Sequence, residues 1–213
     1  MAAGKLIIIS SPSGGGKGTL ITEVRKLLPD LGYSCSHTTR PKRAGEEEGR
    51  EYYFISEDEF RRRIAANDFL EYAVVHGHLY GTSIAESRKA VNTGKDLIVE
   101  VDVQGALSIM KRQPDASVSI FILPPSFEVL RARLTARATE DAAELHMRLQ
   151  NSFDEVLQYK NFDYVIVNQD LSTAVRQLAS VILASRQATN RQNDAIQSIL
   201  DSFDASRHLF EGE

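Results

Sequence analysis

One stretch near the N-terminus constrains the fold of this chain more than any other. Residues 11–19 read S-P-S-G-G-G-K-G-T and lie between the apolar run 6–9 and a segment, 20–28, with apolar residues at helical spacing. Three consecutive glycines can adopt backbone angles closed to other residues, so successive N–H groups can point at one centre. The start of the following helix adds its partial positive charge. The order strand, glycine turn and helix therefore predicts a phosphate-binding loop.

The lysine of this stretch stands where such a loop places its lysine, directly after the last glycine, within reach of the outer phosphates of a nucleotide. The strict pattern is G-x-x-x-x-G-K-[ST], whereas Ser11 occupies the first glycine position here and Gly18 the hydroxyl position. A structural turn with a solvated lysine is the alternative, but the flanking strand and helix favour binding. The expected nucleotide-binding residues are Ser13, Gly14, Gly15, Gly16, Lys17, Gly18 and Thr19.

Composition narrows the class of protein. At 213 residues and 42% hydrophobic content, the chain fits one α/β domain with insertions or two small domains. Cys35 is the only cysteine, which excludes an internal disulfide. No apolar run approaches the roughly 20 residues that span a bilayer, and no signal-peptide pattern is present. We expect a cytoplasmic protein with no membrane partner, and the net charge of -4 argues against nucleic acid.

The next segment combines a basic loop with strand and helix signals. Residues 33–36 could form a short strand, after which Arg40 and Arg43 flank a proline-containing loop and can converge on one phosphate. Composition alone would favour a solvated basic loop. Capping boxes at Ser56 and Ser83 predict two helices, with a strand over 69–75 and turns over 76–82 between them. His76 and His78 alternate as metal ligands can, but no close Cys or third His completes a site.

Two acidic residues stand at the end of another predicted strand. Residues 96–101 read as a parallel strand buried on both faces, and Glu100 and Asp102 alternate at its carboxyl end, where α/β folds bind ligands. A helix N-cap is the other explanation for Asp102, because residues 103–111 have helical character. A carboxylate here can also serve the hydrated Mg²⁺ of a nucleotide.

The C-terminal half predicts a helical hairpin and an amphipathic tail. A buried strand over 117–123 is followed by two helices, the first starting at Ser126 and the second ending at about Tyr159. Arginines from both helices flank one polar turn over 139–141, and a helical hairpin of this composition suits a mobile lid. The last core strand covers 163–167, and an amphipathic helix covers 171–186. Beyond it, residues 196–203 have helical apolar spacing, so the tail could pack on the core or on a partner chain, as in a homo-oligomer.

Nine motifs in order resemble one family, the guanylate kinases, a branch of the nucleoside monophosphate kinases. They are S-P-S-G-G-G-K-G-T, S-H-T-T-R-P-K-R-A-G-E, E-Y-Y-F, F-L-E-Y, Y-G-T, E-V-D-V-Q-G-A, I-L-P-P-S, R-L-T-A-R-A-T-E and V-N-Q-D. The resemblance extends from Leu6 to Arg186. It implies an α/β fold with a P-loop nucleoside triphosphate hydrolase-like core, in which helices flank a parallel sheet, plus a GMP-binding insertion and a helical lid.

The resemblance also implies an activity and a division of the chain. The activity is Mg²⁺-dependent transfer of the terminal phosphoryl group of ATP to GMP, and also to dGMP, giving ADP and GDP in the case of GMP. The core would comprise residues 1–35, 83–125 and 156–186, the GMP-binding domain 36–82, the lid 126–155 and the tail 187–213. A non-catalytic guanylate-kinase-like module that binds phosphopeptides is the alternative, but such a module should lack the loop lysine.

The family's functional positions fall on named residues of this chain. Those implied for GMP are Ser36, Arg40, Arg43, Tyr52, Glu71, Tyr80, Gly81, Thr82, Glu100 and Asp102. Asp102 is also the residue expected to serve Mg²⁺, because Glu100 stands where many relatives have Asp. Arg133 and Asn168 join the loop at the ATP site, and Lys17, Arg40, Arg137 and Arg148 would neutralise charge on the transferred group. Glu71 is implied to read guanine, because one carboxylate can accept from two neighbouring donors. The bare sequence would favour an exposed strand charge at that position.

Overall fold

The core of the chain is a five-stranded parallel sheet. The computed structural model describes residues 4–207, apart from 44, 76, 115 and 137–141. The sheet has the order β2-β7-β1-β8-β9, and every neighbouring pair in it is parallel. Its strands are β1 (Leu6–Ser10), β2 (Gly32–Tyr33), β7 (Leu97–Glu100), β8 (Ser117–Leu123) and β9 (Tyr164–Val167). The α/β fold with a parallel sheet expected from the sequence is confirmed.

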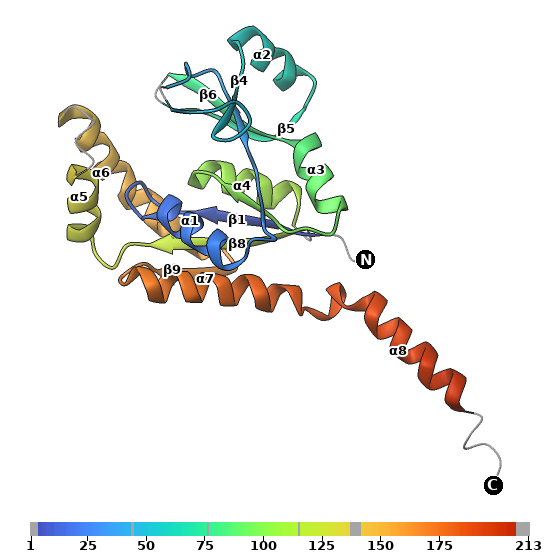
Figure 1. Cartoon of the computed structure of the whole chain (residues 1–213). Coiled ribbons are helices and arrows are strands. Elements are labelled where there is room, and N and C mark those ends of the chain that lie inside the picture. The colour runs from blue at the N-terminus through green and yellow to red at the C-terminus, as the bar shows by residue number, and fades with distance from the viewer. Residues whose placement is uncertain (1–3, 44, 76, 115, 137–141, 208–213) are drawn as a thin grey trace.

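The central strand is apolar throughout because both of its faces are covered by helices. Ile7 and Ile9 pack towards α1 (Lys17–Leu27) and α7 (Leu171–Arg186), while Leu6 and Ile8 pack towards α4 (Val103–Arg112). Side chains of a strand alternate between its two faces, so a strand between two helical layers needs apolar residues at every position. Figure 1 shows α4 above the sheet and α7 below it.

A second sheet stands over one end of the first. Its order is β4-β3-β6-β5, with strands β3 (Ser36–Thr38), β4 (Tyr52–Phe54), β5 (Phe69–Val75) and β6 (His78–Ser83). The segment expected to be one short strand over 33–36 is divided between the sheets, with β2 in the core and β3 here. The turns expected over 76–82 were wrong from residue 78 onward, because β6 pairs antiparallel with β5 from His78 to Ser83.

Both capping boxes open helices as predicted. Ser56 Oγ accepts the Glu59 N–H at the start of α2 (Glu57–Ala65), and Ser83 Oγ accepts the Glu86 N–H at the start of α3 (Ile84–Asn92). In each case the serine side chain satisfies a backbone donor that the helix itself leaves unpaired. The helix α2 packs on the second sheet through Phe60, whose ring stacks on Phe69 with centroids 4.5 Å apart.

The predicted helical hairpin lies at the side of the core where β1 ends (Figure 1). Its helices are α5 (Phe127–Ala136) and α6 (Ala142–Leu157), and the 3-10 helix η1 (Gln158–Asn161) leads from α6 to β9. The polar turn over 139–141 and Arg137 lie outside the described residues. Leu130 and Leu134 are the buried residues of α5, and Leu134 contacts the glycine loop at Gly14.

A buried acid fixes the point where the tail leaves the core. Asp96 accepts hydrogen bonds from the Lys5 N–H, Arg186 Nε and Arg191 Nη2 at 2.9, 2.9 and 2.7 Å. Arg186 ends α7, and Arg191 ends the 3-10 helix η2 (Thr189–Arg191), so both segments are attached to the start of β7. An acid this buried needs such partners to remain ionised.

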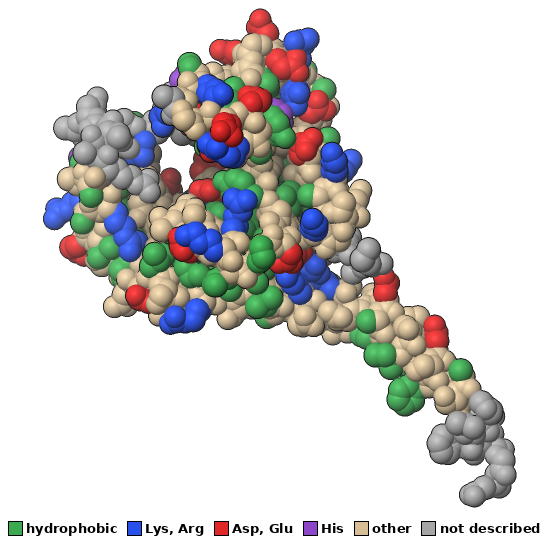
Figure 2. All heavy atoms as spheres, in the orientation of Figure 1, with side chains coloured by type: hydrophobic (Ala, Val, Ile, Leu, Met, Phe, Trp, Pro, Cys, Tyr) green, Lys and Arg blue, Asp and Glu red, His purple; other side chains and the backbone are tan. Residues whose placement is uncertain are grey.

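The tail itself forms α8 (Asn193–Ser206), which extends away from the core (Figure 1). Its apolar residues are exposed, as Figure 2 shows, and they are Ile196, Ile199, Leu200 and Phe203. Of the two arrangements considered, packing on the core is therefore not the one observed, and association with a partner chain stays a prediction. Within the described residues, no helix combines the length and apolar character needed to cross a membrane.

Candidate functional site

The glycine turn between β1 and α1 forms a cup because of its backbone angles. Gly14 and Gly16 have φ of 83° and 89°, in the left-handed region that favours glycine. A Cβ at Gly16 would also collide with the Asn168 side-chain amide. Gly16 is the N-cap of α1, which begins at Lys17, so the free amides of the first helical turn face the same side as the loop. This arrangement suits a phosphate group.

Residues remote in sequence hold the loop from outside. The Gly15 carbonyl accepts from Asn168 Nδ2 at 3.0 Å and from Arg133 Nη1 at 3.3 Å. Arg133 Nη2 also donates to the Asn168 carbonyl at 2.9 Å. The Ser13 N–H donates to Glu155 Oε2 at 3.0 Å. Two residues expected at the ATP site, Arg133 and Asn168, are thus at the loop, and they contact its backbone.

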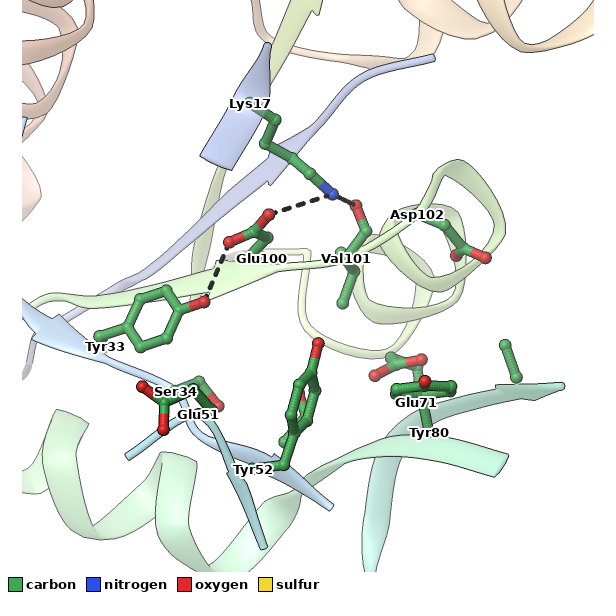
Figure 3. A pocket seen from close by; sticks show the side chains of 12 residues that line it. Lys17, Tyr33, Ser34, Glu51, Tyr52, Glu71, Tyr80, Glu100, Val101 and Asp102 are labelled. Atoms are coloured by element: carbon green, nitrogen blue, oxygen red, sulfur yellow. Dashed lines mark hydrogen bonds and ion pairs between the residues drawn. The ribbon is translucent and has the colours of Figure 1, made fainter. Parts of the chain in front are cut away.

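A cavity of about 350 Å³ lies between the core sheet and the second sheet (Figure 3). Core residues and second-sheet residues face each other across it, which brings together segments far apart in the sequence. Seven of the residues expected at the site line it, namely Lys17, Ser36, Tyr52, Glu71, Tyr80, Glu100 and Asp102. The sequence analysis did not single out the other five, which are Tyr33, Ser34, Glu51, Ala73 and Val101.

Lys17 is directed into this cavity from the loop side. Its Nζ donates to the Val101 carbonyl at 2.7 Å and lies 3.8 Å from Glu100 Oε1 (Figure 3). Burial lowers the pKa of Lys17, and the nearby acids, Glu100 first, act in the opposite direction. Glu100 also accepts from the Tyr33 hydroxyl at 2.9 Å, and burial beside this carboxylate raises the pKa of Tyr33. A cation and an acid are therefore paired where the loop meets the cavity.

Glu71 is the most deeply buried carboxylate on the opposite wall. Its side of β5 faces the core, the residue is 7% exposed, and Thr82 Oγ1 donates to its Oε1 at 2.7 Å. Burial raises the pKa of Glu71 to about 7, although the Thr82 hydrogen bond lowers it. The exposed strand charge that the bare sequence favoured is therefore not what the structure has. Ser36 Oγ lies 3.5 Å from the same Thr82 hydroxyl.

Asp102 lies beside Glu71, across a glycine. A Cβ added at Gly105 would be 3.0 Å from Glu71 Oε2 and 3.1 Å from Asp102 Oδ1, so the two carboxylates flank this position. Asp102 Oδ1 accepts the Gly105 N–H at 2.7 Å as the N-cap of α4. Asp102 is thus both a helix cap and a cavity residue, and the two explanations weighed from the sequence are compatible.

The basic loop lies at the edge of the cavity. Arg40 Nη2 pairs with Glu46 Oε1 at 2.7 Å, and its guanidinium is 5.5 Å from the centroid of the Tyr52 ring, which lines the cavity. Arg43 is exposed, and its backbone N–H donates to Glu46 Oε2 at 2.8 Å. The two arginines are thus linked through one glutamate, and neither lines the cavity. Arg40 lies close to it through Tyr52.

The remaining predicted residues differ in where they lie. Gly81 faces the stacked rings of Phe60 and Phe69, because a Cβ there would be 2.9 Å from Phe60 Cζ. Arg148 is half-buried on α6, on the hairpin as expected, and Arg137 is outside the described part of the chain. Gly18 and Thr19 are exposed at the first turn of α1, where a ligand could reach their amides.

No cluster of three or more His, Cys, Asp or Glu residues within the described ranges could hold a metal on its own. His78 opens β6, and His76 lies outside those ranges. The donors that do fit Mg²⁺ are the carboxylates near the loop, because Mg²⁺ prefers oxygen ligands and keeps several waters. A Cβ at Gly18 would lie 3.7 Å from Glu100 Oε1, so Glu100 is within reach of the loop.

The sequence analysis also missed the side chains of Glu155 and Tyr33, which contact the Ser13 N–H and Glu100. Glu155 follows Arg148 by seven residues, which places both on one face of the predicted helix. That spacing is a signal that could have identified Glu155. Tyr33 has no comparable signal, because its contact with Glu100 depends on the pairing of β2 with β7.

The fold and the phosphate-binding loop together define the class of protein to which this chain belongs. The loop follows the central strand of a parallel sheet, at the carboxyl edge where α/β proteins bind ligands, and its lysine enters a polar cavity. The chain is an α/β nucleotide-binding protein with a phosphate-binding loop.

Comparison with known proteins identifies the family within this class. The guanylate kinase family model matches residues 3–185. The guanylate kinase of Thermotoga maritima is 43% identical over 194 residues, which cover 91% of this chain and 93% of that protein. That of Geobacter metallireducens is 44% identical and covers 94% and 97%. The crystal structure of guanylate kinase from Anaplasma phagocytophilum is 32% identical, covers 90% of each chain and superimposes with a TM-score of 0.72. The chain belongs to the guanylate kinase family, which is a family of nucleotide kinases.

Proposed function

We propose that this protein transfers the γ-phosphoryl group of ATP to GMP, and also to dGMP, with Mg²⁺. The products with GMP are ADP and GDP. One observation carries the proposal: Glu71, a buried carboxylate, lines the same cavity as Lys17 of the phosphate-binding loop. A base-reading acid and a phosphate-binding cation in one cavity are what two adjoining nucleotides require. The names of the relatives support the same reaction.

The acid suits guanine because of the hydrogen bonds that this base offers. Guanine presents two neighbouring donors, the ring N–H and the exocyclic amine, and one ionised carboxylate can accept from both. Adenine would leave Glu71 without these partners in a buried place, and an unpaired buried polar group discriminates strongly. Thr82 and Ser36 would orient the acid from behind, since the Thr82 hydroxyl already donates to Glu71. Asp102, on the other side of Gly105, would face the same base.

The phosphate of GMP would lie at the edge with the basic loop. Arg40 and Arg43 are linked through Glu46, and a phosphate could replace this carboxylate as their shared anion. Tyr52 and Tyr80 line the cavity nearby, and their rings contact edge to face with centroids 5.6 Å apart. Their hydroxyl groups can donate to phosphate oxygens. In this proposal residues 36–82 form the GMP-binding unit.

ATP would bind at the loop on the other side of Lys17. The amides of residues 13–19 would hold its phosphates, and Lys17 would exchange the Val101 carbonyl for a phosphate oxygen. Arg133 and Asn168 would shape this site, and Arg137 and Arg148 would close over it from the lid formed by residues 126–155. Phosphoryl transfer needs alignment and neutralisation of charge more than a dedicated base, so cations on several segments suffice. Closure would also exclude water, which would otherwise hydrolyse ATP.

Mg²⁺ would be held by the phosphates of ATP and, through water, by the carboxylates at the end of β7. When bound, it neutralises negative charge on the phosphates. Asp102 stays the predicted metal residue, and Glu100 is a second candidate because its Oε1 would lie 3.7 Å from a Cβ at Gly18 in the loop. Lys17 and Glu100 would hold their positions through their mutual contact until the nucleotides bind.

The proposal is tested by measuring ADP release with ATP and one acceptor at a time, namely GMP, dGMP, AMP or UMP, with Mg²⁺ or with excess chelator. We expect turnover with GMP and dGMP, little with AMP or UMP, and none without the metal. As a control, Glu71→Ala should lose GMP turnover while ADP binding persists. Equal rates with GMP and AMP, or no transfer to GMP, would refute the proposal.

A further inference from the structure

An acid outside the cavity holds the backbone of the phosphate-binding loop. Glu155 lies near the end of α6, and its Oε2 accepts the Ser13 N–H at 3.0 Å across 142 residues of sequence. Ser13 starts the glycine turn, within which the Gly15 N–H closes back on the Pro12 carbonyl at 2.9 Å. The last part of the helical hairpin is therefore attached to the first part of the loop through one side chain.

The surroundings of this acid make the contact a strong one. Burial raises the pKa of Glu155, the Ser13 N–H lowers it, and Asp102 and Lys17 act in opposite directions on it. Because a half-buried carboxylate is costly without a partner, the Ser13 peptide and Glu155 stabilise each other.

The loop is also held at a second peptide, two residues further along the chain. The Gly15 carbonyl is bound by Asn168 and Arg133, so the backbone is fixed on both sides of Gly14. That glycine has a φ of 83°, and a glycine can adopt more backbone conformations than other residues. Without the contact at Ser13, the peptides around Gly14 could rotate, and the amides would no longer point at one centre.

We propose that Glu155 is a positioning residue for ATP: it fixes the Ser13 peptide and thereby keeps the loop in the shape that binds the phosphates. This inference rests on the proposed function in taking ATP as the ligand of the loop. The acceptor oxygen, and not the negative charge, is the property that matters. Glutamine keeps an acceptor oxygen at this position, and alanine removes it.

The test compares Glu155→Ala, Glu155→Gln and the control Asp154→Ala, which removes an exposed acid one residue away. ADP binding is measured by calorimetry, and KM for ATP and for GMP by initial rates, on the full chain. For Glu155→Ala we expect the Kd of ADP and the KM of ATP to rise about tenfold, which corresponds to ~1.4 kcal/mol. The KM of GMP should not change, and Glu155→Gln and Asp154→Ala should stay within about twofold of the unaltered protein.

Several results would overturn the inference. An unchanged Kd for ADP in Glu155→Ala, with only a lower Tm, would make Glu155 purely structural. A lower Kd would mean that Glu155 competes with the phosphates. A tenfold loss in Glu155→Gln would assign the effect to the charge. If alanine prevents folding, Glu155→Met keeps the chain length without the oxygen and must weaken ADP binding equally. Failure of the unaltered protein to phosphorylate GMP while it binds ADP would refute the proposed function and leave this inference standing.

Discussion

The pH dependence of GMP binding follows from one buried acid. Burial raises the pKa of Glu71 to about 7, with Thr82 acting against the shift. In the proposed complex the acid must accept two hydrogen bonds from guanine, and only the ionised form can do so. Raising the pH from 6 to 8 should therefore tighten GMP binding, with release of a proton on binding below about pH 7.

The size of the effect follows from the fraction of protein in the competent form. With a pKa of about 7, roughly a tenth of Glu71 is ionised at pH 6 and roughly nine tenths at pH 8. Since the apparent Kd equals the intrinsic Kd divided by that fraction, GMP should bind about tenfold more tightly at pH 8 than at pH 6. Between pH 8 and 9 the affinity should be nearly constant.

The assay is calorimetric titration of GMP at several pH values, without ATP. The phosphate of GMP itself titrates near pH 6, so the matched control is Glu71→Gln, which keeps the size of the side chain and cannot ionise. At each pH, the Kd of GMP for the unaltered protein is divided by the Kd for Glu71→Gln. The pH dependence of this ratio is due to Glu71. Parallel pH profiles for the two proteins, or weaker binding of GMP at pH 8 than at pH 6, would refute the reasoning.

Three further predictions concern stability and charge. Because the pKa of Glu71 is raised in the folded protein, the ionised form of Glu71 destabilises the fold increasingly as the pH rises to about 7. Calorimetry should therefore give Glu71→Gln a Tm a few degrees higher than that of the unaltered protein at pH 8, with a smaller difference at pH 5. The same variant should lose the preference for GMP over AMP. Lys17→Met should lower kcat at least about 100-fold. Its Tm should not fall, since burial already disfavours the charge of Lys17. The control Lys26→Met, on the exposed face of α1, should leave kcat unchanged. Asp96→Asn should lower the unfolding free energy, measured by urea titration, by roughly 3 kcal/mol. The control Asp30→Asn removes an exposed partner of the same Arg186 and should cost less than about 1 kcal/mol. Despite the burial of Asp96, its backbone and arginine contacts lower its pKa, so the stabilisation by Asp96 should fade as the pH falls below about 4.

Much of the fold could be predicted because its signals are local. The glycine turn specifies its own backbone angles. In both capping boxes, the side chains of Ser56 and Ser83 accept the backbone hydrogen bonds that the sequence predicts. The unbroken apolar run of β1 indicates a strand covered on both faces. The expectation failed at residues 78–82, where a short polar and glycine-containing stretch is a strand only because β5 lies beside it.

The division between sequence and structure is clearest at Glu71, Asp102 and Glu155. The sequence by itself determined the parallel α/β core, the phosphate-binding loop and the family, since each depends on residues close together in the chain. Only the tertiary structure decided that Glu71 is buried against Thr82, that Asp102 faces it across Gly105, and that Glu155 holds the Ser13 peptide. Burial and the pKa of an acid depend on which distant segments cover it, and that is set by the packing of the two sheets and the helical hairpin.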